Sequence, residues 1–299
     1  MGAFLDKEKF HQEQFLRQSG YFIETHPLNE IRPTRLPQAL ASQNLNPAIR
    51  ADALDTFERD HIQWPRGSQA LPSPDLCDIS VNCVNFLYPF STRPDALADL
   101  MGMIFPTLQT ILPFENGAFI NFFWPHDPQK SNADAAFIFQ RHDSKRQMVL
   151  LHWNYCETYS PAVLNEGQNY AHLSAADLPL KNDQLEDINQ LFYQPFLRLL
   201  ELQLLAQQLE KERCQNVDLV SVLQIMPVNN LDLLEVVSPG LRKFGISPTQ
   251  IWQNLVQPYD RFTSTFTENL FGHFDISSYP EMLDWWLYIT RRYPWVVKK

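Results

Sequence analysis

The chain has 299 residues, 44% of them hydrophobic, so it can bury a substantial core in one large or two ordinary domains. No apolar run approaches the roughly 18 to 20 residues of a membrane span, and the first 19 residues lack a signal peptide's apolar block. We therefore expect a cytoplasmic protein with no membrane partner. A net charge of −10 argues against coating nucleic acid by bulk electrostatics but leaves room for a local basic groove.

The first third of the chain predicts helices separated by proline-rich connections. Residues 4–19 form a partly periodic apolar pattern that Gly20 can end. After a proline-interrupted connection, Asn46 and Pro47 indicate the start of a helix that runs to about residue 62. Helical spacing recurs at 79–87, and a further helix is expected over 94–104.

The remaining elements are expected to build an α/β core. Aromatic and β-branched runs predict strands over 118–124, 134–139 and 148–155, and the apolar run 218–226 predicts a central strand covered on both faces. Leucines over 197–209 occupy most of a helix circumference, which is typical of a helix buried on two sides. Ser247 and Pro248 predict the start of a short helix that runs to about Val256, and we expect the aromatic C-terminus to pack against the body.

A hairpin at 134–157 contains the most informative polar residues. Pairing Asp134 with His152 centres the turn near Asp143, within a polar segment. Because side chains alternate along a strand, Asp134, His152 and Asn154 then share one face of the sheet, whereas Glu157 would face away on a regular strand. Metal-dependent phosphodiesterases use this geometry, since carboxylates bind a hard cation and a nearby lysine offsets phosphate charge.

Over most of its length the chain resembles bacterial PD-(D/E)XK proteins related to restriction endonucleases. The similar segments, in order, are NLNPAIR at 44–50, IQW at 62–64, NCVNFLYP at 82–89, the hairpin with the residues that follow it to 159, the helix at 192–206, and IMPVN at 225–229. This resemblance implies an α/β fold with a nuclease-like mixed sheet flanked by helices. A helical N-terminal section, 1–110, would pack on a core, 111–299, that ends in the aromatic segment, all in one compact unit.

The resemblance assigns roles position by position. Asp134 matches the metal-binding Asp of the family, but His152 stands where the pattern has Glu and Asn154 where it has Lys. On the helix that follows, Arg198 and Glu201 stand where Gln and Arg are expected. Glu157 matches an acidic residue downstream of the hairpin.

These departures favour a protein without catalysis. Imidazole and amide are weak ligands for Mg²⁺, and loss of a positioned acid, base or charge partner costs about 10²- to 10⁴-fold. We therefore predict a degenerate, inactive family member with no cofactor, retained to bind nucleic acid or a protein partner. The alternative is an active DNA or RNA endonuclease with a variant site around Asp134 and His152 that uses Mn²⁺ or Mg²⁺. The oligomeric state stays open.

Small basic groups are candidates for nucleic-acid contacts. Arg141, Lys145 and Arg146 in the hairpin turn are expected to lie beside the former active site, and Arg198 is a weaker candidate. Two further basic groups are the pair Arg32 and Arg35 and the C-terminal residues Arg291, Arg292, Lys298 and Lys299. Each basic group, taken alone, is more typical of a solvated surface.

Two further motifs have competing interpretations. His126 and Asp127 suggest a metal pair, but beside a proline they are more typical of a turn. Cys156 shares the strand parity of His152 and suggests a nucleophile, although a buried structural thiol is favoured. Cys77, Cys83, Cys156 and Cys214 lack CxxC spacing, so we expect buried, reduced thiols and no structural zinc.

Overall fold

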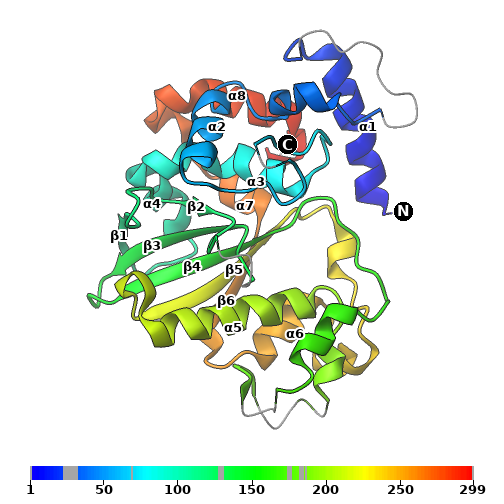
Figure 1. The fold of residues 1–299 in the computed structure, drawn as a ribbon, viewed down its shortest axis with the longest axis vertical. Coiled ribbons are helices and arrows are strands. Elements are labelled where there is room, and N and C mark those ends of the chain that lie inside the picture. Colours follow the sequence, from blue (N-terminus) through cyan, green and yellow to red (C-terminus); the bar gives the residue numbers. More distant parts are fainter. Residues whose placement is uncertain are drawn as a thin grey trace.

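A mixed β-sheet runs through the centre of the chain, with helices on both of its faces (Figure 1). The computed structural model describes residues 2–22, 33–68, 70–126, 131–173, 177–181, 185 and 187–297. Arg32, Asp127, Lys298 and Lys299 from the sequence predictions lie outside these residues. Among the described helices, none is both long and apolar enough to cross a membrane.

The strands are β1 (Leu108–Leu112), β2 (Asn121–Phe122), β3 (Ala135–Arg141), β4 (Arg146–Trp153), β5 (Leu219–Met226) and β6 (Phe262–Phe266). Their order across the sheet is β1-β3-β4-β5-β6, and the short β2 pairs with β3 beside this path. The β1, β3 and β4 pairings are antiparallel, whereas β5 and β6 continue the sheet in parallel. The expected α/β fold with a mixed sheet and a helical N-terminal part is confirmed.

The hairpin has the expected register. Ala135 pairs with Leu151, which puts Asp134 opposite His152 at the open end of the hairpin. Strand alternation divides the core: Phe137 and Phe139 join the hydrophobic cluster on one face, and Ala136 and Ile138 join that on the other. By the same alternation, Asp134 and His152 lie on the face that contains Ala136 and Ile138.

The helices divide between the two faces (Figure 1). Helices α5 (Phe196–Glu212) and α6 (Pro248–Leu255) cover the face that contains Ala136 and Ile138. The opposite face is covered by α1 (Ala3–Gln18), α2 (Arg50–Arg59), α3 (Ile79–Leu87), α4 (Pro94–Gly102), α7 (Thr267–Phe271) and α8 (Leu283–Arg292). The division of the chain at residue 110 stays a prediction.

Several predicted elements differ from the structure for local reasons. Helix α2 begins at Arg50, not at Pro47, because residues 47–49 form a separate turn before it. Asn46 caps that turn, since its side-chain oxygen accepts from the backbone N–H of Ala48 (3.0 Å) while its amide donates to the Trp285 carbonyl (3.2 Å). The strand expected over 118–124 is only the two residues of β2. Strands β1 and β6 were not predicted, since each is short and partly polar.

The aromatic C-terminus packs on the body as expected, but the interpretation of Arg292 as a solvated residue is wrong. Arg292 is fully buried, with 0% of its surface exposed. Its guanidinium donates to Gln12 Oε1 (3.0 Å), to the carbonyl (2.7 Å) and side-chain oxygen (2.6 Å) of Asn44, to the Leu76 carbonyl (3.2 Å) and to Tyr288 Oη (2.9 Å). One side chain therefore joins α8 to three N-terminal segments.

We expect Arg292→Met to lower the free energy of unfolding by about 3 kcal/mol or more, because several buried acceptors would lose their donor at once. Urea unfolding followed by circular dichroism measures this change. The matched control is Arg291→Met, at the exposed neighbouring position, with an expected change within about 0.5 kcal/mol. Equal unfolding midpoints for the two variants would contradict the role given to Arg292.

Candidate functional site

A cavity of about 370 Å³ lies where the start of β3, the end of β4 and the first turn of α5 meet. It brings together Asp134, His152, Asn154, Glu157 and Arg198, all of which were candidates from the sequence. The polar residues lie on the α5 face of the sheet, at the open end of the hairpin. Because the strands on either side are buried, these side chains are held by a rigid frame.

Asp134 has hydrogen-bond partners on one carboxylate oxygen and a positive charge near the other. Its Oδ2 accepts from the backbone N–H of Trp153 (2.8 Å) and lies 3.3 Å from His152 Nδ1, while its Oδ1 lies 3.9 Å from Arg198 Nη2. Burial alone would raise the pKa of Asp134, but the His152 hydrogen bond and the Arg198 charge outweigh it and lower that pKa. The carboxylate is therefore ionised at neutral pH.

Asn154 extends this network along the sheet. Its Nδ2 lies 3.0 Å from Glu157 Oε1 and 3.5 Å from His152 Nε2, and its Oδ1 accepts from Gln224 Nε2 (2.9 Å). A carboxylate can only accept, so the proton of neutral His152 belongs on Nδ1, next to Asp134. The Asn154 contact assigns the same tautomer, because it leaves Nε2 as the acceptor.

Glu157 turns into the site, and the expectation that it faces away is wrong. Strand β4 ends at Trp153, so alternation no longer governs the residues that follow. The side chain of Asn230 donates to the carbonyls of both Tyr155 (2.9 Å) and Glu157 (3.0 Å), and the Tyr155 backbone N–H donates to the Glu157 carboxylate. Burial raises the pKa of Glu157, against the hydrogen bonds from Asn154 and Tyr155.

Arg198 lies between two carboxylates. From α5 it donates to the Asn132 carbonyl, approaches Asp134, and places Nη1 3.8 Å from Glu201 Oε2. Tyr170 donates to Glu201 Oε1 (3.3 Å), and burial raises the Glu201 pKa against the charge of Arg198. The departure of this helix from the family pattern therefore puts a fixed positive charge beside Asp134.

The residues present do not fit Mg²⁺, which prefers carboxylate oxygens and water. Of the three motif positions only Asp134 is a carboxylate, and its Oδ2 already accepts from the Trp153 N–H and lies beside His152. Both Glu157 oxygens also accept hydrogen bonds, from Asn154 and from Tyr155. Within the described part of the chain, no group of three or more His, Cys, Asp or Glu side chains is arranged to hold a metal ion.

The basic hairpin turn does not lie beside this site, and that expectation is wrong. Gln140 pairs with Arg146 at one end of the hairpin, whereas Asp134 and His152 lie at the other end. At about 3.3 Å per residue the two ends are about 20 Å apart. Arg141 instead contacts Asp143 (3.2 Å) and Gln147 (3.0 Å). A nucleic-acid role for Arg141, Lys145 and Arg146 stays a prediction.

The cysteine nucleophile hypothesis is also contradicted by geometry. Cys156 lies beyond the end of β4 and packs in the cluster on the opposite face, where its thiol donates to the Cys77 carbonyl (3.2 Å). The hydrogen bond with Cys77 and burial raise the pKa of the Cys156 thiol. None of the four cysteines, all of which the structure describes, forms a disulfide, although Cys77 and Cys214 are only half-buried and not buried as expected. His126 contacts the Phe122 carbonyl (2.8 Å).

The sequence reasoning missed Gln224 and Arg66. Gln224 lies beside His152 in the parallel register and is 1% exposed. The only amide in β5, whose other residues are apolar except for Ser221, was a usable signal, because a buried polar group requires a partner. Arg66 lines the cavity from a loop, and its position in sequence carried no signal.

Comparison with known proteins identifies one family. A family model described as "Restriction Endonuclease associating with ARP" matches residues 9–293, which is nearly the whole chain. No curated protein and no solved structure matches the chain.

We expect Arg198→Gln to raise the pKa of Asp134, because the variant removes a charge that favours the ionised form. Carboxyl ¹³C NMR titration measures this pKa, and Arg198→Lys, which keeps the charge, should raise it less. Since the folded pKa lies below the unfolded value, Asp134 contributes stability above about pH 4, and this contribution is lost as the pH falls through the folded pKa. Identical Asp134 titration in all three proteins would contradict the coupling.

Proposed function

The chain belongs to the restriction endonuclease family that its residues 9–293 match, and from this premise we propose that it is a non-catalytic member that binds duplex DNA. The observation that carries the proposal is the state of Asp134, whose two carboxylate oxygens face His152, the Trp153 N–H and Arg198. A divalent cation at Oδ2 would have to displace the Trp153 N–H and His152, and a cation at Oδ1 would lie close to the positive charge of Arg198.

The identity of the other motif residues supports the same proposal. His152 and Asn154 supply an imidazole and an amide where a second carboxylate and a lysine would be needed. Their hydrogen bonds run from Asp134 to Glu157, so both carboxylates are held by protein donors. The arrangement is therefore better suited to a stable polar surface than to activating water.

Family membership supports DNA as the ligand, and two arginines supply a means of contact. Arg66 and Arg198 line the cavity, and guanidinium groups bind phosphate oxygens through paired hydrogen bonds. With a net charge of −10, the contact must be local. Phosphate contacts of this kind position a duplex without reading its sequence.

A second candidate function is a variant endonuclease, and the position of Glu157 favours it. Glu157 lines the same cavity as Asp134 and His152. In the described structure these two carboxylates and the imidazole are not yet arranged to hold a metal ion. That donor set is better suited to Mn²⁺ than to Mg²⁺. Glu157 would first have to leave Asn154 and the Tyr155 N–H.

We expect no cleavage of single- or double-stranded DNA or RNA by the wild-type protein, with either Mg²⁺ or Mn²⁺. Gel assays against a known nuclease as a positive control measure this, with Asp134→Ala and Glu157→Gln run in parallel. Cleavage in Mn²⁺ that disappears in both variants would overturn the non-catalytic proposal in favour of the second candidate.

We expect Arg66→Ala and Arg198→Gln each to weaken duplex binding and to reduce the slope of log affinity against log salt by about 1 per lost phosphate contact. Fluorescence anisotropy across a salt series measures both quantities, with duplex RNA as a comparison. Arg59→Ala, on a separate cavity, is the matched control and should bind as wild type. A wild-type protein that does not bind duplex DNA at low salt contradicts the proposal.

A further inference from the structure

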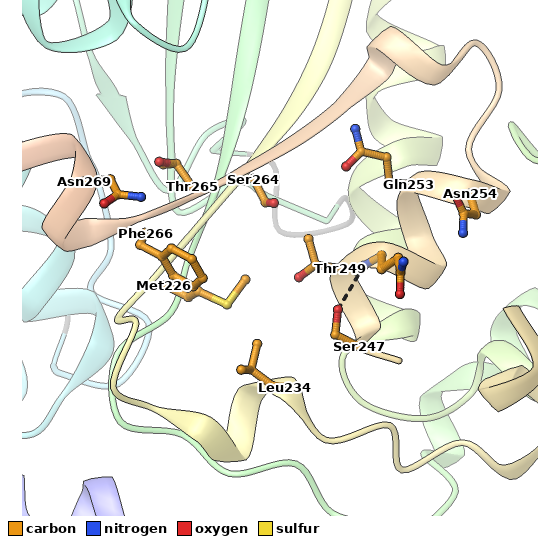
Figure 2. Close-up of a pocket in the computed structure, with 11 residues that line it drawn as sticks. Met226, Leu234, Ser247, Thr249, Gln253, Asn254, Ser264, Thr265, Phe266 and Asn269 are labelled. Carbon is orange, nitrogen blue, oxygen red and sulfur yellow. Dashed lines mark hydrogen bonds between the residues drawn. The ribbon is translucent and has the colours of Figure 1, made fainter. Parts of the chain in front are cut away.

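A second cavity, of about 490 Å³, lies at the carboxyl ends of β5 and β6, beside the start of α6 (Figure 2). These two strands are parallel, and crevices at the carboxyl ends of parallel strands are common binding places in open α/β sheets. The volume falls within the roughly 300 to 1,000 Å³ of small-molecule sites. Neither the motif residues nor the proposed DNA contacts account for this cavity.

The lining has a distinctive chemistry. None of its eleven residues, all of which the structure describes, carries a formal charge. Hydroxyl and amide groups, which both donate and accept hydrogen bonds, are supplied by residues such as Thr249, Gln253, Ser264 and Asn269. A charged ligand would find no counter-charge here and would lose its hydration without compensation. The lining therefore selects for an uncharged ligand with several polar atoms.

The arrangement of the lining also favours a flat ligand. Figure 2 shows the Phe266 ring and Met226 together on one side of the cavity, with Ser247 and Thr249 across from them. The hydrogen bond drawn among these residues joins the Gln250 backbone to Ser247 (3.3 Å), so the polar groups opposite Phe266 are not consumed by pairing across the cavity. An aromatic face opposite polar groups fits a ring that stacks and is recognised at its edge.

We propose that this cavity binds a nucleobase, as a planar, uncharged heterocycle with hydrogen-bond donors and acceptors. Phe266 provides the stacking face, and Asn269 and Thr249 contact the edge of the base. Thr249 donates its hydroxyl proton to Gln224 Oε1 (3.2 Å), so its oxygen is free to accept from the ligand.

Gln224 connects this cavity to the first site. Its Nε2 donates to Asn154 Oδ1 (2.9 Å), so a continuous chain of hydrogen bonds runs from Glu157 through Asn154 and Gln224 to Thr249. The base can belong to a free nucleoside or to an unpaired position in DNA. Only the second source rests on the proposed DNA binding.

Isothermal titration calorimetry with adenosine, guanosine, cytidine and thymidine tests the proposal. We expect saturable binding of at least one nucleoside, with no gain from a 5′-phosphate because no cation lines the cavity. Phe266→Ala should weaken binding about 5- to 100-fold. Asn269→Ala, at an exposed position that spares the fold, should weaken it about 2- to 10-fold. Phe10→Ala, at a 66% exposed phenylalanine, is the matched control and should bind as wild type.

Two DNA duplexes of the same sequence, one with an extra unpaired base, distinguish the sources. Tighter binding of the bulged duplex that Phe266→Ala abolishes assigns the cavity to a base in DNA. Nucleoside binding without that preference assigns it to a free nucleoside. The proposal is overturned if no nucleoside saturates the wild-type protein at millimolar concentration, or if Phe266→Ala and Asn269→Ala bind as tightly as wild type. Loss of duplex binding alone affects only the proposed function.

Discussion

A guanidinium group taken out of water must have every N–H paired, and burying Arg292 imposes this requirement on each segment packed around it. Its acceptors come from Gln12, Asn44, Leu76 and Tyr288, so these segments must converge before the charge can be buried. The network then continues through Gln12 to Tyr155, directly after the motif strand. The contacts that bury Arg292 therefore also hold the residues that follow β4 in place, through Gln12 and Tyr155.

That fixed chain explains the character of the first site. The Tyr155 hydroxyl is hydrogen-bonded to Glu8 and Gln12, and its carbonyl accepts from Asn230. Because these contacts fix Tyr155, the residues after Trp153 bend instead of continuing the strand. The Glu157 side chain therefore lies on the α5 side of the sheet. Arg198 lies between Asp134 and Glu201, so a positive side chain of the protein already stands beside the motif carboxylate. Such a site keeps its geometry without an external cation.

Patterns with a short period were readable from the sequence, and contacts between distant segments were not. The hairpin register followed from alternation and a polar turn, and the buried helix α5 from its leucines. Glu157 could not be oriented, because the bend after Trp153 depends on Asn230, more than 70 residues away. Arg292 is instructive, since it lies at helical spacing from the buried Trp285 and Tyr288, and that spacing outweighs its charge as a guide to burial.

The pairing of Gln12 with Arg292 joins residues 280 positions apart, which bears on how the protein is made. On a ribosome, α1 emerges long before α8 exists, so Phe4 and Phe15 of α1 have no complete pocket while the sheet is being synthesised. At about 5 to 20 residues per second this interval lasts from about 14 seconds to nearly a minute. Helix α1 therefore stays without its final packing partners longest, and during synthesis it is the part of the chain most exposed to chaperones and to misassembly.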